Sequence, residues 1–89
     1  MRIRILDTWW NVYFIDPQDD IFLLPNGVDR TVGVTDISER TIYIADNLDK
    51  EFEREVFLHE YCHASSFVSG LNLSEKSEEC LCMWVGKNT

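Results

Sequence analysis

Positive charge and cysteine are both scarce in this 89-residue chain. Its 8 Lys and Arg stand against 16 Asp and Glu, which gives a net charge of −8. Nucleic acids and anionic membranes are bound through clusters of positive charge, so neither is expected as a partner. The 3 cysteines are too few, and odd in number, for a secreted disulfide scaffold, and we therefore expect a cytoplasmic protein.

Long apolar runs are also missing. No stretch approaches the roughly 18 consecutive apolar residues that a membrane-spanning helix needs. Residues 1–10 interrupt their apolar positions with Arg2, Arg4 and Asp7, so they do not have the pattern of a signal peptide. A hydrophobic content of 45% is typical of a folded protein, and the length predicts one domain over residues 1–89.

The first half of the chain has the pattern of a β-sheet. Residues 1–6 alternate apolar and basic side chains, and residues 9–15 are mostly aromatic and β-branched, which predicts a pair of strands. Residues 31–35 and 41–45 predict two more strands, which could form a hairpin through residues 36–39.

The hydrophobic period then changes to that of helices. Asn47 or Asp49 can cap a helix of roughly 20 residues, because an apolar stripe at helical spacing follows them. Ser74 can cap a last helix over residues 75–85, which Gly86 would end. Strands followed by two helices predict an α+β domain in which a small antiparallel sheet packs against both helices.

The most informative segment lies in the later half of the first predicted helix and reads His59-Glu60-Tyr61-Cys62-His63. It holds both histidines of the chain, and residues four apart on a helix share a face, so the two imidazoles can bind one metal ion. Glu60 lies about 100° around the helix from His59, where its carboxylate can reach a water on that metal without being a ligand. Metal-assisted hydrolysis requires such a set.

A catalytic zinc site needs a third protein ligand, and the chain has no further histidine. The last predicted helix offers Glu75, Glu78 and Glu79, and the apolar pattern does not decide between the last two. Cys80 and Cys82 offer an alternative, a closed structural site completed by the two histidines. Cysteines two apart on a helix point to different faces, so all the cysteines are expected instead to be small buried apolar residues.

Together these residues resemble the small HExxH metallopeptidase-like proteins of phages and mobile elements, relatives of the ImmA-type and minigluzincin peptidases. The resemblance covers most of the chain, including the strand pair at 3–15, the strand at 40–44, the motif helix and the Glu-Glu-Cys-Leu-Cys-Met segment at 78–83. It implies a zinc-dependent peptidase in which the two histidines hold the metal and Glu60 is the general base.

The resemblance also implies a third ligand and a place for the substrate. It assigns the ligand to Glu79, with Glu78 as the alternative, and it puts Met83 where relatives carry an acidic or amide residue that orients a histidine. A protein or peptide substrate would add an extended strand to an edge of the sheet. The residues expected at that edge are Thr41, Ile42, Tyr43 and Ile44.

Two functions remain open from the sequence. The resemblance favours cleavage of a specific regulatory protein. Larger peptidases of this type use an additional Tyr or His to stabilise the oxyanion, but neither Tyr13 nor Tyr61 can be assigned that role. The alternative is a catalytically weak or inactive protein of the same fold that binds a regulatory or host partner. The sequence predicts no oligomeric state.

Overall fold

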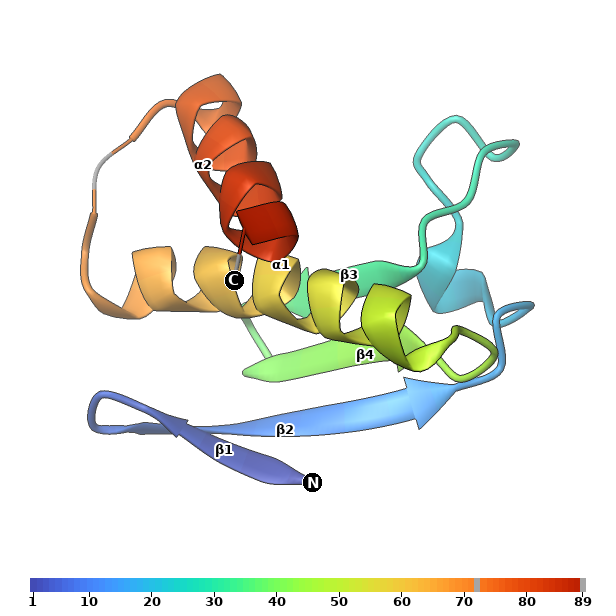
Figure 1. Cartoon of the computed structure of the whole chain (residues 1–89), viewed down its shortest axis with the longest axis horizontal. Helices are drawn as coiled ribbons and strands as arrows, with labels where there is room; N and C mark the ends of the chain where they lie inside the picture. The colour runs from blue at the N-terminus through green and yellow to red at the C-terminus, as the bar shows by residue number, and fades with distance from the viewer. Residues whose placement is uncertain (72, 89) are drawn as a thin grey trace.

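A computed structural model describes residues 1–71 and 73–88, so residues 72 and 89 of the predicted domain lie outside the described part. Its elements are β1 (Arg2–Ile5), β2 (Thr8–Ile15), the 3₁₀ turn η1 (Asp20–Phe22), β3 (Gly33–Asp36), β4 (Thr41–Ala45), α1 (Lys50–Val68) and α2 (Glu75–Asn88). The class is α+β, as predicted. Figure 1 shows α1 lying along one face of the sheet and α2 packed on α1, away from the strands.

Strand pairing corrects one part of the prediction, because the sheet is mixed rather than wholly antiparallel. The strand order is β1-β2-β4-β3. The two predicted hairpins, β1–β2 and β3–β4, are antiparallel, but β4 lies beside β2 and runs parallel to it. A period-2 pattern reports which side chains share a face, whereas the direction in which two hairpins join depends on contacts far apart in the chain.

The prediction that residues 41–45 form an edge of the sheet is wrong. β4 has β2 on one side and β3 on the other, and both Ile42 and Ile44 are fully buried. The nearly continuous apolar sequence of this strand reflects its central position, since interior strands bury more of their surface than edge strands. The edge strands are β1 and β3. Of these two, β3 lies beside α1, the helix that carries His59 and His63.

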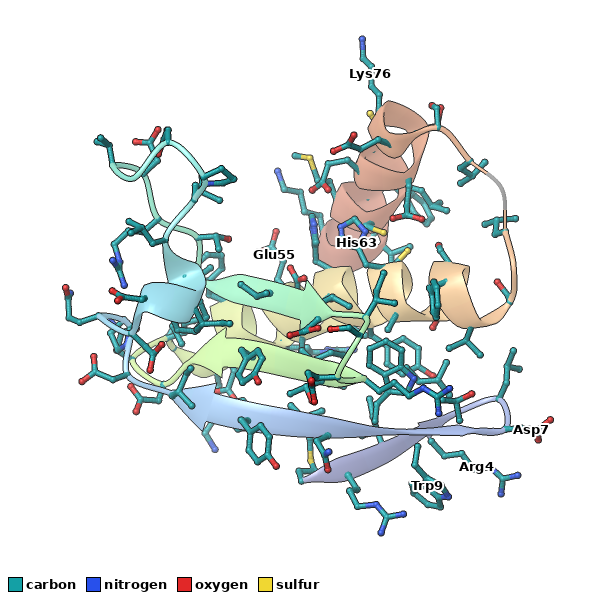
Figure 2. All side chains as sticks on the ribbon, turned by 180° about the vertical axis from the view of Figure 1, so that it is seen from behind. Arg4, Asp7, Trp9, Glu55, His63 and Lys76 are labelled. Atoms are coloured by element: carbon teal, nitrogen blue, oxygen red, sulfur yellow. The ribbon has the colours of Figure 1, made fainter. Side chains whose placement is uncertain are left out.

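The main core lies between α1 and the sheet. Its buried members are Ile5, Trp10, Val12, Ile42, Ile44, Val56 and Ala64. The alternation of strand side chains is plain at Trp10 and its neighbour Trp9, which are 1% and 51% exposed. Figure 2 shows Trp9 on the face of the sheet that α1 does not cover, and there the Arg2 guanidinium lies 4.4 Å from the centre of its ring.

The ends of α1 follow from local signals. Asp49, one of the two predicted caps, accepts a hydrogen bond from the backbone N–H of Phe52 at 2.9 Å. Gly70 takes the left-handed conformation just beyond the helix, with a φ of 71°, which ends it. Neither helix of the described chain combines the length and apolar character needed to cross a membrane.

The sequence predicts that α2 ends at Gly86, but the helix continues to Asn88. Gly86 is buried against α1, and a Cβ atom at this position would lie 2.8 Å from the backbone oxygen of Glu55. The glycine therefore permits a close approach of the two helices. In the sequence alone, such a glycine cannot be told apart from one that ends a helix. This approach brings α2 over the histidines of α1.

Candidate metal centre

The two histidines converge as their spacing predicts. The rings of His59 and His63 lie 5.0 Å apart between centroids, and their Nε2 atoms are 3.3 Å apart. Two donors at the usual zinc distances in a tetrahedral site are separated by about 3.3–3.4 Å, so the observed spacing suits one shared ion. Figure 2 shows His63 where α2 meets α1.

Glu79 of α2 completes the group. Its Oε1 lies 2.8 Å from Nε2 of His59, and its Oε2 lies 3.0 Å from Nε2 of His63. One ligand atom from each of these three residues lies within 4.8 Å of the others. Because the Glu79 side chain is 51% exposed, the group is open to solvent on one side, which is what a site for water and substrate requires.

Glu78, the alternative ligand, takes a different position. Its Oε2 lies 2.8 Å from Nδ1 of His63, the ring nitrogen on the side away from Glu79. A proton on Nδ1 donated to Glu78 leaves Nε2 unprotonated, which is the form that binds a metal. Consecutive residues are about 100° apart on a helix, so the two glutamates reach different nitrogens of the same ring.

Glu60 is buried beside the histidines, with only 8% of its surface exposed. The Thr35 hydroxyl donates to its Oε1 at 2.9 Å. Burial raises the pKa of Glu60 above its usual 4.5, while the Thr35 hydrogen bond and the charges of the two histidines act in the opposite direction. A carboxylate whose pKa is raised above that of a free glutamate is a stronger base, which suits a group that takes up a proton.

A cleft of about 320 Å³ opens beside these residues, between β3, α1 and α2. Its walls include Gly33, Val56, Glu60, Met83 and Lys87. Met83, expected to replace an orienting residue, lines this cleft, and no hydrogen bond or ion pair links its side chain to His59 among the described residues. Sequence reasoning missed Gly33 and Lys87, although a glycine inside a strand pattern is a known sign of close packing.

The residues predicted to bind substrate lie elsewhere. Since Ile42 and Ile44 face α1, Tyr43 faces the other side of the sheet, where its ring is 6.0 Å from that of Tyr13. Tyr61 packs against Phe57, with ring centroids 5.9 Å apart. Within the described part of the chain, no tyrosine and no residue of β4 lines the cleft.

The cysteines take no part in the metal group. Cys62 and Cys82 are buried, as predicted, but Cys80 is exposed, which corrects the prediction for that residue. Burial raises the pKa of the Cys82 thiol far above its usual value, and its hydrogen bond with Cys62 adds to this effect. In the described residues the metal-binding group contains no cysteine, so the closed Cys₂His₂ site is not formed.

Comparisons of the chain with models of known protein families, with curated proteins and with solved structures find no match. The resemblance to HExxH peptidases therefore remains a prediction from the sequence.

Proposed function

We propose that this chain is a zinc-dependent peptidase in which His59, His63 and Glu79 hold one zinc ion and Glu60 is the general base. The observation that carries the proposal is the convergence of two Nε2 atoms and one carboxylate, with a second carboxylate buried beside them. A purely structural zinc site closes its coordination with protein ligands and has no use for a non-ligating carboxylate. The ligand chemistry, two imidazoles and one carboxylate, suits zinc.

A bound zinc ion would lower the pKa of its water to near neutrality and polarise the carbonyl of the substrate. Glu60 would accept the proton of the attacking water and deliver it to the leaving amine. Glu78 would keep His63 in the tautomer that leaves Nε2 free, and would fix the orientation of its ring.

The proposed substrate is an extended segment of a protein. β3 is an edge strand and also forms one wall of the cleft, so its unpaired backbone groups are available to a peptide. We therefore propose that the substrate pairs with β3 and not with residues 41–45. A peptide added along this edge would pass close to Glu60, because Gly33 and Glu60 line the same cleft.

A specific regulatory protein in the cytoplasm remains the proposed target. The resemblance favours this kind of substrate over general digestion. All 3 cysteines are free thiols, which is consistent with a reducing compartment.

One observation favours a second candidate function, the binding of a regulatory or host partner with little or no hydrolysis. The larger peptidases that the chain resembles stabilise the oxyanion with an additional Tyr or His, and no tyrosine lines the cleft within the described residues. Lys87 is the only positively charged side chain among the described residues that line it. The two candidates differ in whether Glu60 is needed.

Elemental analysis of the purified protein after supply of zinc tests the site. We expect about one zinc per chain in the wild type, loss of zinc in His63→Ala and Glu79→Ala, and full zinc in Glu75→Ala, which removes an exposed glutamate of the same helix. Glu60→Gln should keep the metal and abolish hydrolysis of protein substrates. A wild-type protein that binds no zinc would contradict the proposal, and an unchanged function in Glu60→Gln would favour the partner-binding candidate.

A further inference from the structure

The carboxylate of Glu60 is held by β3, the edge strand opposite α2. Gly33 and Thr35 of β3 pair with Ile44 and Ile42, which face α1, so both residues also face α1. The Thr35 hydroxyl lies 2.9 Å from Oε1 of Glu60 and 3.1 Å from its backbone oxygen. A Cβ atom at Gly33 would lie 2.7 Å from the side chain of Val56 and 3.1 Å from Oε2 of Glu60, so the glycine lets β3 approach α1 closely beside this carboxylate.

The two oxygens of the carboxylate consequently have different surroundings. Gly33 and Glu60 line the cleft, whereas Thr35 does not. Oε1 accepts the hydrogen bond from Thr35 on the closed side, and Oε2 lies over the glycine on the side of the cleft. A hydrogen bond to an ionised acceptor is among the stronger ones in proteins, so this contact fixes the rotation of the carboxylate.

We propose that Thr35 is a positioning residue for Glu60, whose hydrogen bond to Oε1 directs Oε2 toward the water to be activated. This inference rests on the proposed function. The same strand that offers its edge to the substrate thereby also holds the base. A displacement of β3 would disturb both.

The experiment compares Thr35→Val, which removes the hydroxyl at similar volume, with Thr35→Ser, which keeps it. Thr35→Ala also lacks the hydroxyl but adds no bulk, and it repeats the test if the valine disturbs packing. Thr41→Val is the matched control, because Thr41 is a buried strand threonine whose hydroxyl donates to the backbone oxygen of Glu39. Each full-length variant is loaded with cobalt(II) and titrated with acetohydroxamic acid, a small chelator that places a proton against a neighbouring carboxylate. Binding is followed through the visible spectrum of the cobalt.

We expect Thr35→Val and Thr35→Ala to bind acetohydroxamic acid about tenfold more weakly than the wild type, with metal content unchanged. Thr35→Ser and Thr41→Val should match the wild type. On any peptide that the wild-type zinc protein cleaves, Thr35→Val should lower kcat about tenfold or more and leave KM nearly unchanged.

The outcomes separate this inference from the proposed function. If Thr35→Val and Thr35→Ala bind the chelator as the wild type does, the positioning role is overturned while the metal site stands. An equal weakening in Thr41→Val would also overturn it, because the effect would then belong to the sheet as a whole. A wild-type protein that takes up neither zinc nor cobalt overturns the proposed function, and this inference with it.

Discussion

Helix α1 has two sides of opposite character. Toward the sheet it presents Val56 and Ala64, which are 7% and 0% exposed and pack among apolar strand residues. Toward α2 it presents His59 and His63, which meet two glutamates. The sheet side gains stability from removal of apolar surface from water, while the α2 side brings together polar groups that a metal would satisfy. Glu60 lies at the boundary between the two.

Because the sheet side of α1 holds the apolar core, a core substitution there should lower the free energy of unfolding more than any change on the α2 side. Ile44→Ala should lower the free energy of unfolding by about 2–5 kcal/mol, because it leaves a cavity under α1. Denaturant unfolding of the metal-free protein measures this. Ile37→Ala is the control, since Ile37 is 42% exposed and should lose far less. Equal losses in the two variants would contradict the assignment of the core.

Gly86→Ala tests the close approach on the α2 side. The added methyl group would press on the backbone oxygen of Glu55, and we expect a loss of about 1–3 kcal/mol in the free energy of unfolding. It should also weaken zinc binding, because Glu79 would move away from the histidines with α2. Lys87→Ala, the neighbouring change to an exposed residue, should alter stability little. Unchanged stability in Gly86→Ala would mean that the helices are not in close contact.

Glu78→Gln tests the orienting role of Glu78. The amide retains the size of the side chain but lacks the negative charge that holds the Nδ1 proton of His63, so zinc affinity should fall about 10–100-fold. Competition with a fluorescent zinc chelator measures the affinity. Glu75→Gln serves as the control. Complete loss of zinc in Glu78→Gln, with retention in Glu79→Ala, would exchange the roles of the two glutamates.

Glu60→Gln should raise the stability of the metal-free protein, because a buried carboxylate is replaced by a neutral group that still accepts from Thr35. The raised pKa means that folded Glu60 holds its proton more tightly than the unfolded chain does. The wild type is therefore most stable, with respect to this group, below pH 4.5, and loses stability as the pH rises through the raised pKa. Urea unfolding measured on both sides of pH 4.5 should give a difference in the free energy of unfolding between variant and wild type that grows with pH. A difference that stays constant with pH would show that the buried charge of Glu60 is not its cause.

The smallest expected effect is a change in the rates at which the cysteine thiols react, and it reports directly on the contact between α1 and α2. Cys80 is exposed, while Cys62 and Cys82 are buried and hydrogen-bonded between α1 and α2. In the zinc-loaded protein one thiol should react rapidly with an alkylating reagent and two slowly. Removal of zinc with a chelator should speed the two slow reactions, because the metal no longer joins the helices. Rates that do not change on chelation would show that packing alone holds α2 in place.

The sequence by itself determined the features that depend on residues close together in the chain. The Asp49 cap, both hairpins and the shared face of His59 and His63 follow from side chains a few residues apart. Their physical basis is the fixed periodicity of strands and helices together with the hydrogen bonds of a helix end. For this reason the sequence alone predicts α1 and the common face of its two histidines.

Only the tertiary structure decided between candidates with equivalent local patterns. Glu78 and Glu79 are adjacent on similar stripes of α2, and the crossing of α2 over α1 at Gly86 determines which nitrogen each one reaches. In the same way, the placement of β4 beside β2 puts β3 at the edge and brings Thr35 to Glu60 across 25 positions of sequence. Such contacts depend on how distant segments share one core, and no local period in the chain encodes that.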